Sequence, residues 1–250
     1  MTILYTIIIF IFGSLFTSFF HVLATRLNNK ESLLGRSHCD ACNHELKLIE
    51  VFPIIGYIIN KGKCRYCNEK IAINHLIYEI IGGALFASGY LLYDFNLTFW
   101  IYTILISVLI IESISDIKDM IVIDKIWMFG IIPILIIRII ENSILTYLIS
   151  SMGLFLILLF IAFIAQKIFK KDALGGGDIK LYLFIGFFIP IQVGLLSIFL
   201  TSLFGLIYGI IFIKDRDKYI PLVPFISLAV IISFIYGTKI IDWYLTLIGM

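Results

Sequence analysis

Residues 145–166 read LTYLISSMGLFLILLFIAFIAQ, an apolar run without a charged residue. A helix of about 20 apolar residues crosses the hydrocarbon core of a bilayer, so this run predicts a transmembrane helix. The whole chain agrees, because 61% of its 250 residues are hydrophobic and only 14% are charged, against about 25% charged in soluble domains. The net charge of +2, without dense basic runs, argues against a nucleic-acid partner. The sequence therefore predicts an all-α polytopic membrane protein.

Further apolar runs bring the expected number of transmembrane helices to about eight. The first run lacks a basic segment before it and a small-residue cleavage site after it, so we interpret it as an uncleaved span rather than a signal peptide. Near the sixth run, a hairpin or a kinked span is an alternative to one straight helix. The residues that suggest it are Phe187-Phe188-Ile189-Pro190 and Gly194. The expected spans are residues 3–24, 76–93, 98–115, 125–140, 145–166, 179–195, 197–213 and 221–240.

Basic residues predict the orientation of the spans, because loops on the cytoplasmic side are enriched in Lys and Arg. Four loops hold 17 of the 19 Lys and Arg residues, and the exceptions are Arg138 and Lys239. We therefore expect these loops in the cytoplasm and both termini outside. The loops are residues 25–75, 116–125, 167–180 and 214–220.

The one long polar segment, residues 25–75, contains all four cysteines. A segment of this length is too small for a robust hydrophobic core, so it needs an additional stabilising link such as a metal site or disulfide bonds. Two C-x2-C pairs are typical of a closed four-thiolate zinc site, which is structural rather than catalytic. The sequence therefore predicts a small zinc-binding cytoplasmic lobe. Its expected ligands are Cys39, Cys42, Cys64 and Cys67, with 21 residues between the pairs.

Two alternatives to zinc remain for the cysteines. Two disulfides would need an oxidising compartment, which the expected cytoplasmic location disfavours, and the thiols could also be reduced and free of metal. Asn43 and Asn68 follow the two pairs. Asn tolerates the left-handed backbone conformation that a metal knuckle often needs at this position. His38 and His44 are expected at the surface, because four cysteines already complete the coordination shell.

Gly175-Gly176-Gly177-Asp178 stands where a polar loop turns into an apolar run. Burying the charge of an ionisable residue at the end of a membrane helix costs free energy, so such a residue marks a candidate functional site. Glycines let the backbone bend tightly and approach another chain closely. We therefore expect Asp178 to be catalytic, with Gly175, Gly176, Gly177 and Lys180 positioning the backbone or a substrate.

Aspartic-protease chemistry needs a second carboxylate, because two neighbouring acids share one proton and divide the roles of acid and base. Asp116 ends the third expected span on the same side of the membrane as Asp178, so the pair is the expected catalytic dyad. A lone aspartate is also common as a loop or helix-capping residue. The competing acids are Glu112, Asp119, Asp124 and Asp172.

These features, in this order, resemble the type IV prepilin peptidases, intramembrane aspartic proteases with a G-x-G-D motif. Four features carry the resemblance: the first span with Arg26, the two cysteine knuckles, the region from Asp116 to Asp124, and Asp178 with the glycines before it. Ile123 stands where the family often has Pro, and His21 stands where it usually has Asn. The other matching stretches are residues 13–19, 36–42, 61–67, 115–118, 175–180 and 221–225.

The resemblance implies cleavage of the short basic leader from prepilin or pseudopilin precursors in the bacterial cytoplasmic membrane. Many family members also methylate the new amino terminus with S-adenosylmethionine, and Glu79 is a candidate polar contributor. A non-enzymatic transporter or assembly scaffold with a zinc docking lobe is the alternative, and a methyltransferase alone is a third. The expected domains are a first helix (1–24), the zinc lobe (25–75) and a peptidase membrane domain (76–250).

Overall fold

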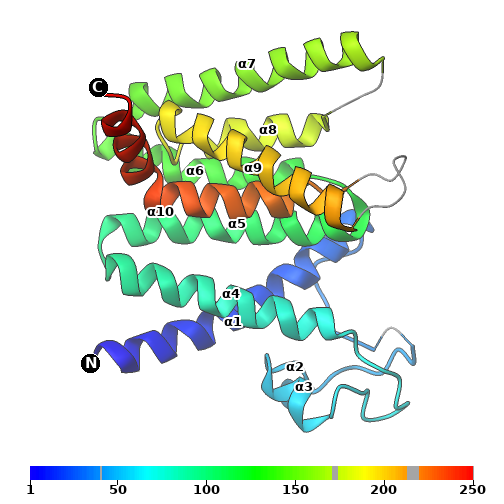
Figure 1. Ribbon diagram of the computed structural model, residues 1–250. Coiled ribbons are helices and arrows are strands. Elements are labelled where there is room, and N and C mark those ends of the chain that lie inside the picture. Colours follow the sequence, from blue (N-terminus) through cyan, green and yellow to red (C-terminus); the bar gives the residue numbers. More distant parts are fainter. Residues whose placement is uncertain (40, 171–173, 213–219, 250) are drawn as a thin grey trace. The chain divides into compact units, whose positions relative to one another are not determined.

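The computed structural model describes residues 1–39, 41–170, 174–212 and 220–249, and Figure 1 shows them as helices joined by connecting segments. Within these residues the only β-structure is two isolated bridges. Helices are expected, because a helix satisfies all its backbone hydrogen bonds within one segment of a membrane protein. Asp172 and residues 214–219 of an expected cytoplasmic loop lie outside the described residues. The helices are α1 (Thr2–Asn28), α2 (Leu48–Val51), α3 (Ile55–Ile59), α4 (Ile73–Tyr93), α5 (Leu97–Asp119), α6 (Asp124–Ile140), α7 (Ile144–Phe169), α8 (Gly176–Ile185), α9 (Ile191–Phe212) and α10 (Val223–Leu247).

The eight predicted spans correspond to α1 and α4 through α10, so the all-α polytopic membrane fold is confirmed. Six of these helices, α1, α4, α5, α7, α9 and α10, are long and apolar enough to cross a bilayer. The other two are shorter, with 17 residues in α6 and 10 in α8. The count of about eight therefore includes two short helices.

The predicted span 179–195 is wrong at its end. Helix α8 stops at Ile185, and α9 begins only at Ile191. Pro190 stands at this break, and proline has no N–H to donate to a preceding helical turn. The apolar composition continues through the break, so hydropathy carries the expected span across it, and the hairpin or kinked span that the sequence left open here is what the structure contains.

The chain forms two compact units, unit 1 (Met1–Ile111) and unit 2 (Glu112–Met250). In unit 1, small residues let α1 and α4 pack closely. A Cβ added at Gly82 would overlap Thr17, and one added at Gly83 would overlap Ser14. Small residues at such crossings bring two backbones together where lipid offers no hydrophobic driving force. This helix pair carries the lobe that connects α1 to α4.

In unit 2, Arg138 holds the break between α8 and α9. Its Nε donates to the carbonyl of Phe187 at 3.0 Å, and its Nη2 donates to that of Phe188 at 3.2 Å. Its Nη1 pairs with Glu141 at 2.7 Å. The side chain is buried, so these partners compensate the charge. This role explains why a basic residue lies outside the expected cytoplasmic loops.

Candidate functional site

Asp116 lies one turn before the end of α5 and is 6% exposed. Its Oδ2 accepts a hydrogen bond of 2.8 Å from the N–H of Val223, the first residue of α10. The first N–H groups of a helix have no partner inside the helix, and the helix dipole favours a negative charge there. The amino terminus of α10 therefore orients the Asp116 carboxylate.

Asp178 is the third residue of α8, and its side chain is half-buried. Gly175 precedes the helix as its N-cap, and its carbonyl accepts the N–H of Asp178 at 3.1 Å. The Asp178 carboxylate lies within electrostatic range of Asp116. Both predicted acids therefore lie in unit 2 within electrostatic range of one another. The Asp116 carboxylate meets the amino terminus of α10, and Asp178 lies in the first turn of α8.

The three glycines before Asp178 have different surroundings. A Cβ added at Gly177 would lie 2.7 Å from the Cβ of Val122, and one added at Gly175 would lie 2.8 Å from Oδ2 of Asp178. A Cβ added at Gly176 would meet no atom within 4 Å. Gly177 therefore permits close packing on the α5–α6 connection, and Gly175 leaves room for the Asp178 carboxylate.

This difference predicts unequal effects of two neighbouring alanine substitutions. We expect Gly177→Ala to lower the free energy of unfolding by about 1–3 kcal/mol, because it overpacks the contact with Val122. Gly176→Ala, the matched control, has space for its methyl group and should leave stability unchanged. Denaturant unfolding of both purified variants in detergent measures the effect. Equal stability of the two variants would contradict the packing role of Gly177.

Glu112 is fully buried in α5, one turn before Asp116. Its Oε2 accepts the N–H of Ile123 at 2.7 Å, and Ile123 follows Val122, the residue that packs against Gly177. Its Oε1 is buried without a hydrogen-bond partner among the described residues. Glu112 therefore holds the α5–α6 connection beside the three glycines at residues 175–177, which we call the glycine turn.

Replacing Glu112 with leucine should leave the Ile123 N–H buried and unpaired. We expect Glu112→Leu to cost about 1–3 kcal/mol of stability and to reduce activity, since the glycine turn loses its support. Glu112→Gln keeps a carbonyl oxygen at the same place and should preserve most of both. Unfolding and activity measured side by side on the two variants test this role, and equal losses in both would point to a need for the acid itself.

Lys180 lies on the exposed side of α8, where its Nζ pairs with Oδ2 of Asp124 at 2.8 Å. The hydrogen bond from Lys180 lowers the pKa of Asp124 below its ordinary value, and a hydrogen bond from Trp127 adds to this. Both partners are half-exposed, and such pairs contribute at most about 1 kcal/mol. The structure thus joins Lys180 to the first residue of α6. A role for Lys180 in positioning a substrate stays a prediction.

The four cysteines meet in the lobe of unit 1. Their sulfur atoms all lie within 4.8 Å of one another, with 3.8 Å between Cys39 and Cys67 and 4.0 Å between Cys42 and Cys64. A disulfide would bring two sulfurs to about 2 Å, so the cysteines are free thiols. Tetrahedral bonds of about 2.3 Å to zinc put sulfurs about 3.8 Å apart. The cluster fits a tetrahedral metal ion.

Backbone geometry supports this reading of the cluster. Asn43 and Asn68 have φ values of 55° and 59°, as expected for the residue after each knuckle. Backbone N–H groups of Cys67 and Tyr66 lower the pKa of Cys64 to about 7, which favours a thiolate ligand. The N–H of Glu69 also lowers the pKa of Cys67, but burial and the neighbouring sulfurs raise it to about 12. A cation at the centre would relieve this crowding of negative charge.

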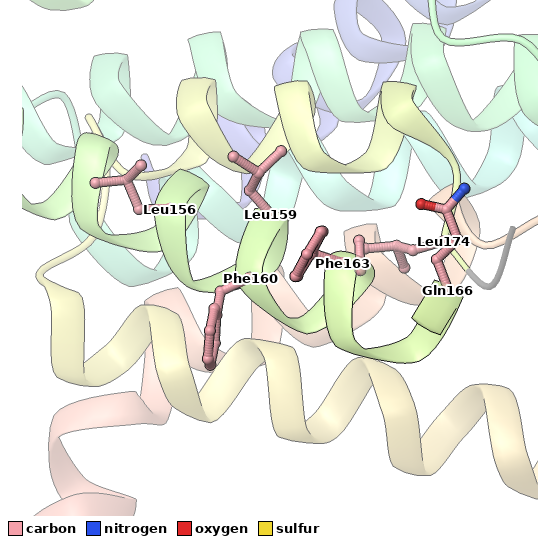
Figure 2. Close-up of a pocket in the computed structure, with 7 residues that line it drawn as sticks. Leu156, Leu159, Phe160, Phe163, Gln166 and Leu174 are labelled. Atoms are coloured by element: carbon pink, nitrogen blue, oxygen red, sulfur yellow. The ribbon is translucent and has the colours of Figure 1, made fainter. Parts of the chain in front are cut away.

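A groove of about 600 Å³ runs along α7 near the glycine turn. Figure 2 shows Phe163 and Leu174 beside one another in it, with Gln166 at the same end. The remaining lining residues are apolar: Leu156, Leu159, Phe160 and Ala162. A lining with a single amide does not support acid–base chemistry, so the candidate site remains the Asp116–Asp178 region.

Comparison with known families covers most of the chain. Residues 11–93 match the bacterial peptidase A24 N-terminal domain, and residues 103–210 match the type IV leader peptidase family. The chain belongs to the type IV leader peptidase family. The second match includes both Asp116 and Asp178, and the first includes all four cysteines. Family membership agrees with the resemblance carried by the sequence motifs.

Several relatives align with nearly the whole chain. The chain is 29% identical over 243 residues to the prepilin leader peptidase/N-methyltransferase of Bacillus subtilis, an alignment covering 95% of this chain and 97% of that protein. It is 29% identical over 255 residues to the protein of the same name from Vibrio cholerae, covering 93% and 95%. For Pseudomonas aeruginosa the identity is 27% over 229 residues, covering 87% and 77%. No solved structure matches the chain significantly.

Proposed function

We propose that this membrane protein is an aspartic endopeptidase that removes the short basic leader from prepilin or pseudopilin precursors, with Asp116 and Asp178 as its catalytic dyad. The observation that carries the proposal is that both acids lie in one unit within electrostatic range of one another, with the Asp116 carboxylate bonded to the amino terminus of α10 and Asp178 in the first turn of α8. Membership of the leader peptidase family supports the reaction class. The names of the relatives supply the precursor class.

In the proposed reaction, the ionised aspartate takes a proton from a water molecule, whose oxygen attacks the scissile carbonyl carbon. The protonated aspartate gives its proton to the carbonyl oxygen, and a tetrahedral intermediate forms. When the C–N bond breaks, the carbonyl re-forms and a proton passes to the leaving nitrogen, so both carboxyl groups return to their starting states. The Val223 N–H keeps Asp116 oriented through these steps.

The distribution of basic residues supports a cytoplasmic site. Asp116 lies in the last turn of α5 and Asp178 in the first turn of α8, next to loops that the positive-inside rule assigns to the cytoplasm. On this topology both termini lie outside, in the bacterial cytoplasmic membrane. The basic leader of a precursor would stay in the cytoplasm while its apolar helix lies in the bilayer. Acids at helix ends also favour a peptidase over a transporter, whose sites lie near the membrane midplane.

Zinc is the metal that best fits the four-cysteine cluster. Four thiolates leave no coordination position for water or substrate, so we assign the ion a structural role in folding the lobe. Chemistry at the metal is therefore not part of the proposed cleavage, which depends on the two aspartates in unit 2.

N-methylation of the new amino terminus with S-adenosylmethionine is the second proposed activity, and it rests on the relatives' names. Glu79, a candidate polar contributor, uses its Oε2 to accept the N–H of Ile54 in the lobe. Mass spectrometry of a co-expressed pilin-like precursor, with and without this protein, tests both activities. We expect an amino terminus shortened by the leader and heavier by one methyl group. An intact leader would overturn the proposed peptidase function, and a shortened but unmethylated terminus would limit the protein to cleavage.

A further inference from the structure

The hairpin formed by α2 and α3, residues 48–59, exposes several large apolar side chains close together in sequence. Leu48 is 90% exposed, Ile49 64% and Ile58 63%. Single exposed apolar residues are ordinary on protein surfaces, but a contiguous group marks an interaction surface. We call this surface the hairpin patch: Leu48, Ile49, Phe52, Ile55, Ile58 and Ile59.

A hydrogen bond places the hairpin beside a membrane helix. The N–H of Ile54, just before α3, donates to Oε2 of Glu79 in α4 at 2.7 Å. Glu79 is six residues beyond Ile73, the first residue of α4, which is about 9 Å along the helix axis. Helix α4 is itself a candidate membrane span, and Figure 1 shows the hairpin alongside its first turns. The hairpin therefore lies level with the end of a span rather than beyond it.

The hairpin also pairs several of its own backbone groups, which a bilayer environment favours. The N–H groups of Gly56 and Ile58 bond to the carbonyls of Phe52 and Ile54 at 2.8 and 3.0 Å. The one acidic side chain in the hairpin, Glu50, accepts the N–H of Lys47 at 2.8 Å. These bonds pair part of the hairpin backbone while its apolar side chains face outward.

Exposed lysines stand at both ends of the hairpin, Lys47 before α2 and Lys61 after α3. Apolar faces flanked by basic residues are typical of elements that lie in a membrane interface, where lysine meets anionic headgroups. We propose that the α2–α3 hairpin inserts its patch into the bilayer interface at the Ile73 end of α4, with Lys47 and Lys61 at the lipid headgroups. This inference rests on the membrane spans and not on the proposed peptidase activity.

Depth-dependent quenching tests the proposal on the full-length protein. Ile58→Trp and Leu48→Trp are reconstituted into phosphatidylcholine–phosphatidylglycerol vesicles, with and without bromine on the upper part of the acyl chains. Tyr66→Trp in the second cysteine knuckle is the matched control, because it keeps an aromatic ring beside His44. The fluorescence of the parent protein is subtracted, since the chain contains three native tryptophans. Limited proteolysis checks that the lobe is folded in each variant.

We expect bromine to quench the added fluorescence at positions 48 and 58 at least twofold more than that at position 66. Equally weak quenching at all three positions would overturn the proposal. An emission shift at position 58 that requires an added pilin-like precursor, without quenching by lipid, would also overturn it and assign the patch to the precursor instead. Neither result depends on whether cleavage occurs, so the test is independent of the peptidase assignment.

Discussion

Asp116→Asn and Asp178→Asn should each abolish processing of a co-expressed pilin-like precursor. Asparagine is nearly isosteric with aspartate but cannot transfer the proton that the dyad shares. General acid–base catalysis contributes about 10²–10⁴-fold in rate, so each variant should lose at least about 100-fold. Asp116→Asn retains a carbonyl oxygen for the Val223 N–H, so the protein should still fold. Immunoblotting of precursor and mature pilin measures the loss.

The matched control for the dyad is Asp119→Asn. Asp119 is exposed at the last residue of α5, less than one turn beyond Asp116, so its substitution changes a nearby charge without touching the proposed dyad. We expect this variant to process the precursor normally. If either dyad variant were folded and fully active, or if Asp119→Asn were equally inactive, the assignment of Asp116 and Asp178 would be wrong.

Loss of the metal should unfold the lobe while leaving the membrane helices intact. Structural zinc binding is worth about 10–16 kcal/mol in apparent free energy at neutral pH, more than a small lobe gains from its own core. We therefore expect Cys64→Ser, which removes the buried member of the cluster, to abolish zinc binding. Elemental analysis should fall from one zinc per chain to nearly none, and proteases should cut between α1 and α4.

A histidine beside the first knuckle provides the control for the metal. His38 precedes Cys39 and is not among the four ligands, so His38→Ser should retain zinc and resist proteolysis. Acidification should also release the metal, because protonated thiols do not bind zinc. A Cys64→Ser protein that keeps full zinc content would contradict the four-cysteine assignment. One that loses zinc but keeps its protease resistance would contradict the structural role.

Much of the fold followed from the sequence because its determinants are local. Apolar length predicts a membrane helix wherever it occurs, and paired cysteines predict a knuckle from their spacing alone. Asn43 and Asn68 adopt the expected left-handed conformation, since the preference belongs to the residue itself. The break at Pro190 was left open as a hairpin or a kinked span, because the stretch around it is as apolar as the helices on either side, and the structure places it between Ile185 and Ile191.

The sequence alone determined which residues are exceptional: two aspartates at the ends of apolar runs, three glycines and four cysteines. Only the tertiary structure decided how they are used. It placed the backbone N–H of Val223 on the Asp116 carboxylate, and this contact does not depend on the side chain at position 223. It also separated Gly177, which packs on Val122, from Gly176, which faces open space. Such contacts join residues far apart in the chain, so they depend on helix packing rather than on local preference.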